Sequence, residues 1–248
     1  MYNPFALKEK TIFVSGASSG IGRAIAIECS KMGAKLFITG RNSNRLNETF
    51  EKLEGEGHIR VIAELKNEDE IRLLAENAPL LDGIVHCAGI GKPVPFQFAG
   101  RKILEEVMEI NFTSPALLSQ YLIRYKKIAR GASIVFVSSI SGVYISSTGG
   151  SVYSASKGAV NGLLKGMAIE LAPKKIRVNS VNPGMIDTNI YSEGTITDEQ
   201  LKEDTLRYPL KRYGKPEEVA YAVIYLLSDA SSWTTGSCLL VDGGYTLL

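Results

Sequence analysis

Strand-length apolar runs alternate with helical patterns along the chain, and this alternation restricts the possible folds more than any other feature. Expected strands cover residues 11–15, 35–39, 59–63, 83–86, 133–138, 176–181 and 237–241. Expected helices cover residues 21–32, 43–53, 68–78, 101–124, 153–171 and 216–227. Because strand–helix–strand connections are right-handed, they place helices on both faces of a buried parallel sheet. The pattern therefore predicts one doubly wound α/β domain over residues 1–248.

Residues 189–214 interrupt the alternation. The stretch is polar, carries a short helical pattern near residues 197–206, and is longer than a connection in a compact domain needs. We expect it to form a lid beside the functional site.

Composition argues against several function classes. The chain has 28 Lys plus Arg against 26 Asp plus Glu, a net charge of +2. A charge this small does not indicate a protein that binds nucleic acid or an anionic membrane. Three widely spaced cysteines and two histidines argue against a disulfide framework or a metal site. With no secretory signal pattern and no run of about 18 apolar residues, we expect a cytoplasmic protein without a membrane segment.

A glycine-rich turn, Ser-Gly-Ala-Ser-Ser-Gly-Ile-Gly at 15–22, follows the first expected strand and opens a helix. Without a Cβ in the way, backbone amides at that helix start can approach a pyrophosphate. The alternative is that the glycines only make a turn. The placement in the first strand–helix unit favours a dinucleotide site.

The end of the second expected strand bears on the choice of dinucleotide. An NAD site usually carries a carboxylate there, but this chain has Thr39-Gly40-Arg41. Arg41 could pair with a ribose 2′-phosphate, with Asn42 as a neutral donor, so NADP(H) is preferred over NAD(H). The alternative is that Arg41 is a solvated loop charge.

Tyr153 and Lys157 are four residues apart and share one face of an expected helix. Ser138 and Ser139 end an expected buried strand, where an open α/β sheet meets its ligand crevice. Side chains alternate along a strand, so Ser138 should point away from the side that Ser139 faces. Ser141 is the second candidate for the active-site serine.

In this order the motifs resemble the short-chain dehydrogenase/reductase family over essentially the whole chain. Besides the turn at 15–22 they are His86-Cys87-Ala88-Gly89, Asn111, Ser139, Tyr153 with Lys157, Pro183-Gly184-Met185-Ile186-Asp187-Thr188, and the ending at 235–244. The resemblance implies a Rossmann-type fold with a seven-stranded parallel sheet of order 3-2-1-4-5-6-7 and a homotetramer.

The resemblance also implies catalytic roles. Tyr153 would donate a proton to a substrate carbonyl while the nicotinamide supplies hydride. Since a tyrosine phenol ionises near pH 10 in water, work near pH 7 requires about 4 kcal/mol of preferential stabilisation of the phenolate. Lys157 would supply it, Ser139 would hold the carbonyl oxygen, and Asn111 would support a water-linked proton path behind the lysine.

The expected cofactor contacts lie at the glycine-rich turn, the strand ends and the catalytic helix. They are Gly16, Ser18, Ser19, Gly20, Ile21, Gly22, Arg41, Asn42, Glu64, Leu65, Cys87, Ala88, Gly89, Tyr153, Lys157, Pro183, Gly184, Ile186 and Thr188.

Two departures from the family pattern stand out. His86-Cys87 replaces the usual Asn-Asn, either as tolerated variation in a buried turn or, in a sharper hypothesis, with His86 as a pH-sensitive link between sheet and cofactor. Glu64-Leu65 occupies the position of an aspartate near the adenine, where glutamate can accept the same hydrogen bond.

The implied activity is hydride transfer between NADP and a carbonyl or alcohol substrate, most like 3-oxoacyl-acyl-carrier-protein reduction in fatty acid biosynthesis. Arg130 and Lys174 fall where such reductases dock their acidic carrier, and the alternative for these residues is a solvated basic face. We also expect Tyr144, Met185, Tyr191 and Tyr208 to line the substrate pocket. Rival functions are a sugar, polyol or hydroxysteroid dehydrogenase and, more remotely, a non-catalytic nucleotide-binding scaffold.

Overall fold

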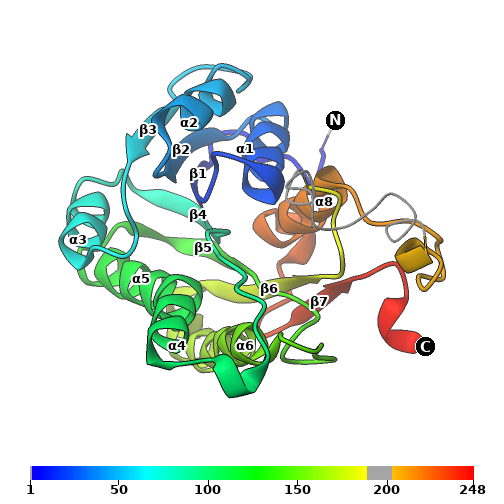
Figure 1. Ribbon diagram of the computed structural model, residues 1–248. Helices are drawn as coiled ribbons and strands as arrows, with labels where there is room; N and C mark the ends of the chain where they lie inside the picture. The colour runs from blue at the N-terminus through cyan, green and yellow to red at the C-terminus, as the bar shows by residue number, and fades with distance from the viewer. Residues whose placement is uncertain (1, 189–202) are drawn as a thin grey trace.

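The structure is a computed structural model that describes residues 2–188 and 203–248 (Figure 1). Its centre is a seven-stranded sheet in the order β3-β2-β1-β4-β5-β6-β7, with every neighbouring pair parallel. The strands are β1 (Thr11–Ser15), β2 (Lys35–Gly40), β3 (Ile59–Ile62), β4 (Leu81–His86), β5 (Ile128–Val137), β6 (Arg177–Pro183) and β7 (Cys238–Val241). The expected strand order is confirmed.

Helices cover both faces of the sheet (Figure 1). They are α1 (Gly20–Lys31), α2 (Ser43–Phe50), α3 (Glu68–Glu76), α4 (Arg101–Met108), α5 (Ser114–Arg124), α6 (Ser151–Leu171) and α8 (Pro216–Leu227). One apolar core joins the sheet to α1, α2 and α8, and a second joins it to α3, α5 and α6. Two separate cores explain why the central strands read as almost unbroken apolar runs.

β3 differs from the expectation of a buried strand. It is an edge strand that pairs only with β2, and the Ile59 and Ile62 residues are 45% and 55% exposed. An apolar run alone does not distinguish an edge position from a central one.

The helix expected over residues 101–124 is interrupted by a π-helical segment, Glu109–Thr113, between α4 and α5. Pro115 has no N–H and its ring clashes with a normally placed carbonyl one turn earlier, so a wider turn relieves both problems. The Ser114 hydroxyl donates to the Glu109 carbonyl oxygen at 2.7 Å. This wide turn carries Asn111.

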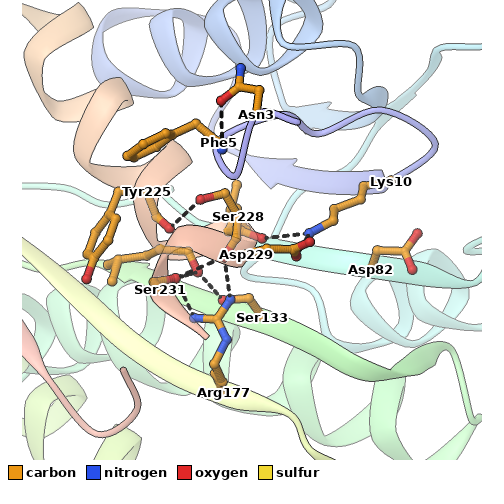
Figure 2. Close-up of polar contacts among 12 residues, drawn as sticks. Asn3, Phe5, Lys10, Asp82, Ser133, Arg177, Tyr225, Ser228, Asp229 and Ser231 are labelled. Atoms are coloured by element: carbon orange, nitrogen blue, oxygen red, sulfur yellow. Dashed lines mark hydrogen bonds and ion pairs between the residues drawn. The ribbon is translucent and has the colours of Figure 1, made fainter. Parts of the chain in front are cut away.

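At the amino ends of the strands, Arg177 holds the C-terminus of α8 (Figure 2). Its guanidinium donates to Ser231 Oγ at 2.8 Å and to the Ser228 carbonyl oxygen at 3.2 Å. Lys10, just before β1, pairs with Asp229 at 2.7 Å. A cation at a helix C-terminus is favourable, so these contacts fix the C-terminus of α8 at the end of the sheet opposite the strand carboxyl ends.

The expected lid at 189–214 lies partly outside the described residues. In its described part Tyr208 is buried and packs against the rings of Tyr213 and Tyr245, with centroids 5.6 and 4.6 Å away. A bridge between Ile186 and Gly214 joins its end to the segment after β6.

Candidate active site

A cavity of about 430 Å³ opens at the carboxyl ends of the strands, where the strand order reverses between β1 and β4. This is where an open α/β sheet binds ligands. Every expected cofactor contact except Asn42 lines it. Its walls also contain Gly40, Ala63, Ile90, Gly91, Ile110, Val137, Ser138 and Met185. Of these residues, only Met185 was expected in the site. The others adjoin the quoted motifs or the expected strand ends in the sequence, and that position could have identified them as lining residues.

The glycine-rich turn is closely packed against the loop after β4. Gly16 has φ +68°, and a Cβ there would lie 2.8 Å from the Ala88 Cα. A Cβ on Gly22 would lie 2.2 Å from the Gly16 carbonyl oxygen. Ser19 precedes α1 in an extended conformation without a side-chain capping bond, and no acidic residue lies in the first turn. The residues present therefore fit a pyrophosphate at this helix start.

The end of β2 lies beside the glycine-rich turn in the wall of the cavity. Arg41 is exposed and lines the cavity. A Cβ on the preceding residue, Gly40, would lie 3.3 Å from Ser18 Oγ, so the Ser18 hydroxyl lies close to the main chain at Gly40. Asn42 does not line the cavity: its side chain caps α2 by accepting from the Arg45 N–H at 2.9 Å. Its predicted role toward the cofactor stays a prediction.

The loop after β3 is tied down on its outer side. The Glu64 N–H donates to Glu70 Oε2 at 2.8 Å, and Ser114 Oγ lies within hydrogen-bond distance of the Leu65 carbonyl oxygen as well as that of Glu109. Glu106 on α4 accepts from both Lys66 and Lys92, and these hydrogen bonds lower the pKa of its carboxyl to about 2. Glu106 thus connects the loops that follow β3 and β4.

Tyr153, Lys157 and Ser139 meet at the inner end of the cavity. One helical turn places the Lys157 ammonium 5.7 Å from the centroid of the Tyr153 ring. Lys157 is 5% exposed and donates to the Val137 carbonyl oxygen at 2.9 Å. The lysine and the tyrosine ring therefore stand side by side in the wall of the cavity.

The three serines have different environments. Ser139 Oγ accepts from the Ser141 N–H at 3.1 Å, so its own hydrogen can be donated to a ligand. Ser138 Oγ points away, into contacts with Asn161 and the Lys157 carbonyl, as side-chain alternation predicted. Ser141 does not line the cavity. The geometry favours Ser139 over Ser141.

Asn111 lies behind the cavity wall. Its Oδ1 accepts from the Ile90 N–H at 2.8 Å, and its Nδ2 donates to the Ile90 carbonyl oxygen and to Ser156 Oγ, both at 3.0 Å. A Cβ on Gly89 would lie 3.3 Å from Asn111 Oδ1 and 3.5 Å from Lys157 Nζ. Asn111 therefore joins the loop after β4 to α6 close to the lysine.

His86 and Cys87 are both shielded from ionisation. His86 stacks on Phe136, its Nε2 lies 2.8 Å from Ser119 Oγ, and its Nδ1 is buried without a partner among the described residues. Burial lowers the pKa of His86 to about 3 and raises the pKa of the Cys87 thiol to about 12. A neutral imidazole from pH 5.5 to 8 favours tolerated variation over a pH-sensitive link, and a protonated thiol is a poor redox switch.

His86 makes stability depend on pH. In the unfolded chain an imidazole binds a proton below about pH 6.5, whereas the folded chain resists it down to about pH 3. We expect the His86 contribution to the free energy of unfolding to be about 2 kcal/mol lower at pH 5 than at pH 8. Urea unfolding of His86→Asn at both pH values should lose this difference, whereas Ser119→Ala, which keeps the imidazole, should retain it. Equal pH dependence in His86→Asn and the unmodified chain would contradict the assignment.

The remaining expectations have mixed outcomes. Tyr144 is 43% exposed, its hydroxyl donates to the Cys238 carbonyl oxygen, and neither Tyr144 nor Tyr208 lines the cavity, because both pack against the C-terminal segment. Tyr191 lies outside the described residues. Across residues 2–188 and 203–248, no three potential metal-ligating side chains gather, and no helix is long and apolar enough to cross a membrane.

Comparisons with known proteins agree with this geometry. A family model described as enoyl-(acyl carrier protein) reductase matches residues 16–246. The chain is 35% identical to glucose 1-dehydrogenase of Gluconobacter oxydans, over 96% of this chain and 92% of that one. It is 34% identical to 3-oxoacyl-acyl-carrier-protein reductase of Rickettsia bellii, over 98% and 99%. A Beutenbergia cavernae structure described as an NAD(P)-dependent gluconate 5-dehydrogenase, with NADP at low occupancy, superposes with a TM-score of 0.90 at 30% identity and covers 99% of this chain and 100% of its own.

The fold and the cavity define a dinucleotide-dependent oxidoreductase. The chain belongs to the short-chain dehydrogenase/reductase family, and it is an NAD(P)-dependent enzyme of that family.

Proposed function

We propose that this enzyme uses NADP(H) to reduce the keto group of a 3-oxoacyl substrate carried on an acyl carrier protein. The observation that carries the carbonyl chemistry is the convergence of Ser139, Tyr153 and Lys157 in one cavity with the glycine-rich turn. A relative with this activity, similar over nearly its whole length, supports the substrate class. The glucose 1-dehydrogenase relative favours sugar oxidation as the second candidate.

Bound cofactor would supply a hydride to the carbonyl carbon. The Ser139 hydroxyl would hold the carbonyl oxygen and stabilise the charge that develops on it. The Tyr153 hydroxyl would deliver the proton, so that hydride and proton together complete the alcohol. Lys157 would stabilise the phenolate that remains, and Asn111 would keep the loop after β4 in place beside the lysine.

Arg41 is expected to select the phosphorylated cofactor. Since a charge-assisted pair with a 2′-phosphate contributes about 1.5–3 kcal/mol, Arg41→Ala should weaken NADPH binding by about 10- to 100-fold and leave NADH binding nearly unchanged. Titration by nicotinamide fluorescence measures both affinities. Arg45→Ala, an exposed arginine outside the cavity, is the matched control. Equal losses for NADPH and NADH, or no loss, would overturn the preference for NADP.

A second cavity bears on the carrier. It has a volume of about 200 Å³ and is lined by Lys126, Arg130 and Lys174 over an apolar floor of isoleucines. It lies at the amino end of β5, and ten residues of strand place it roughly 30 Å from the carboxyl end of the same strand. A carrier docked here would therefore supply the active site of a neighbouring copy rather than its own.

This arrangement requires at least one neighbouring copy, as in the homotetramer that the family resemblance implies. One face of α6 is open to a neighbouring copy: Gly162 and Gly166 are exposed, with no atom within 4 Å of an added Cβ, and Ile169 is 77% exposed. Small residues on an exposed apolar helix face permit close packing between copies.

The double variant Arg130→Glu with Lys174→Glu tests the carrier. We expect the KM for an acyl-carrier-protein substrate to rise about 10-fold, while the KM for a small uncharged acetoacetyl thioester stays unchanged. Lys52→Glu, an exposed lysine that lines neither the second cavity nor the open face of α6, is the control. If the thioester is not reduced at all but glucose is oxidised, the second candidate function replaces the first.

A further inference from the structure

Behind the catalytic residues lies a buried polar cluster that the proposed chemistry does not use. Its buried members are Ser138 after β5, Asn161 on α6, and Ser180 and Asn182 on β6, and the partly buried Cys238 on β7 adjoins them. Asn182 and Ser180 are fully buried, and Asn161 and Ser138 are 4% exposed. Polar groups this deep cost free energy unless they are all bonded, so their partners define what the cluster does.

Asn161 holds the main chain at Lys157. Its Nδ2 donates to the Lys157 carbonyl oxygen at 2.9 Å and to Ser138 Oγ at 2.8 Å. The Ser138 hydroxyl in turn donates to the same Lys157 carbonyl at 3.3 Å. The turn of α6 that carries the lysine is thereby joined to the end of β5.

Asn182 holds the main chain at Ser139. Its Nδ2 donates to the Ser139 carbonyl oxygen at 2.9 Å, and its Oδ1 accepts from the Ser180 hydroxyl at 2.7 Å. These donors fix the orientation of the Asn182 amide, because the nitrogen must face the Ser139 carbonyl.

Ser180 connects the two asparagines. Its Oγ lies 2.7 Å from both Asn161 Oδ1 and Asn182 Oδ1, but a hydroxyl has only one hydrogen to donate. The Cys238 thiol, 3.3 Å from Asn161 Oδ1, is the second donor that the two oxygens need. The two amide oxygens therefore share the Ser180 hydroxyl and the Cys238 thiol as donors, so loss of either asparagine changes the hydrogen bonds left to the other.

We propose that Asn161 and Asn182 are positioning residues that act as one unit, and that together they set the main-chain positions of Lys157 and Ser139. The proposal rests on the catalytic roles assigned to those two residues above. Neither asparagine lines the cavity, so each acts through the residue whose carbonyl it holds. Reacting groups are sensitive to small displacements, and an error of about 1 Å can cost about 100-fold in rate.

The test uses Asn161→Ala, Asn182→Ala and their double variant. We expect each single variant to lower kcat about 10-fold, with the KM for the acetoacetyl thioester and the NADPH Kd within about 2-fold. If the residues act as a unit, the double variant should be no slower than the slower single variant. Independent effects would instead multiply to about 100-fold, and that result would overturn the coupling.

Asn179→Ala is the matched control. Asn179 is also fully buried on β6, but its side chain bonds the Thr234 carbonyl and the Ser237 N–H rather than a catalytic residue. We expect it to lower the Tm as the other variants do and to leave kcat unchanged. A kcat loss equal to that of Asn182→Ala would show a general packing effect and overturn the proposal.

Two further measurements keep the test decisive. Should the asparagine variants fail to fold, Ser180→Ala removes a single oxygen from the link and should still lower kcat about 3-fold.

In the cofactor-free protein, hydrogen exchange of the Ile140 and Ser141 amides should become faster in Asn182→Ala and stay unchanged in Asn179→Ala. Equal increases in the two variants would count against positioning. If Tyr153→Phe abolishes turnover while all these variants keep kcat, the positioning inference fails and the proposed function stands.

Discussion

Tyr153→Phe is expected to lower kcat by about 1,000-fold while the NADPH Kd changes by no more than about 2-fold. Positioned general acids contribute about 10²- to 10⁴-fold to rate, and phenylalanine removes the proposed proton donor without removing the ring beside Lys157. Steady-state kinetics with an acetoacetyl thioester and a fluorescence titration with NADPH measure the two quantities. A loss of turnover with unchanged NADPH binding is the result expected of an enzyme, whereas a nucleotide-binding scaffold would have no turnover to lose.

Tyr144→Phe is the control for this variant. The Tyr144 hydroxyl contacts the Cys238 carbonyl oxygen, and the residue does not line the cavity, so kcat should be unchanged. Retention of more than a tenth of kcat by Tyr153→Phe would mean that the proton comes from another group.

Gly22→Ala is expected to damage both the fold and the cofactor site. The added methyl would lie 2.2 Å from the Gly16 carbonyl oxygen, a main-chain atom that cannot rotate away as a side chain can. Overpacking of this kind costs about 1–3 kcal/mol, and we expect the free energy of unfolding to fall by about 3 kcal/mol. The NADPH Kd should rise by about 100-fold, because α1 must move away from the turn that we expect to bind the pyrophosphate.

Gly100→Ala provides the comparison. Gly100 precedes α4 with φ −69°, and no atom lies within 4 Å of an added Cβ. Its NADPH Kd should be unchanged, and its free energy of unfolding should change by less than about 1 kcal/mol. Urea unfolding and NADPH titration compare the two variants, and unchanged binding in Gly22→Ala would contradict the proposed cradle.

The sequence was informative where structure depends on neighbours in the chain. The turn at 15–22 and the Tyr153–Lys157 pair lie in short segments whose conformation follows from local pattern, and both line the cavity as expected. Asn42 was less predictable, because the same side chain can cap a helix or face a ligand and capping uses its oxygen here.

Contacts between distant elements were not predictable in the same way. The π-helical turn at Asn111 accommodates Pro115 and is held by the hydrogen bond from Ser114 to Glu109. An uninterrupted helix would show the same apolar pattern in the sequence, so the turn could not be predicted from it. Asn161 and Asn182 meet only because α6 packs on β6, and nothing in either segment reveals the other. The neutral state of His86 likewise depends on helix α5 covering the sheet, since Ser119 lies on that helix.

The reversal of strand order between β1 and β4 has a consequence for how this enzyme could change. The loops after β1, β2 and β3 supply the wall that contains Arg41, whereas β5 and α6 supply Ser139 and Tyr153 on the other side of the reversal. If these residues have the roles proposed for them, coenzyme choice and reaction chemistry are encoded in separate stretches of the gene, upstream and downstream of β4. A redesign could exchange the first stretch to switch the electron donor and leave the second intact, which makes the two properties separately adjustable.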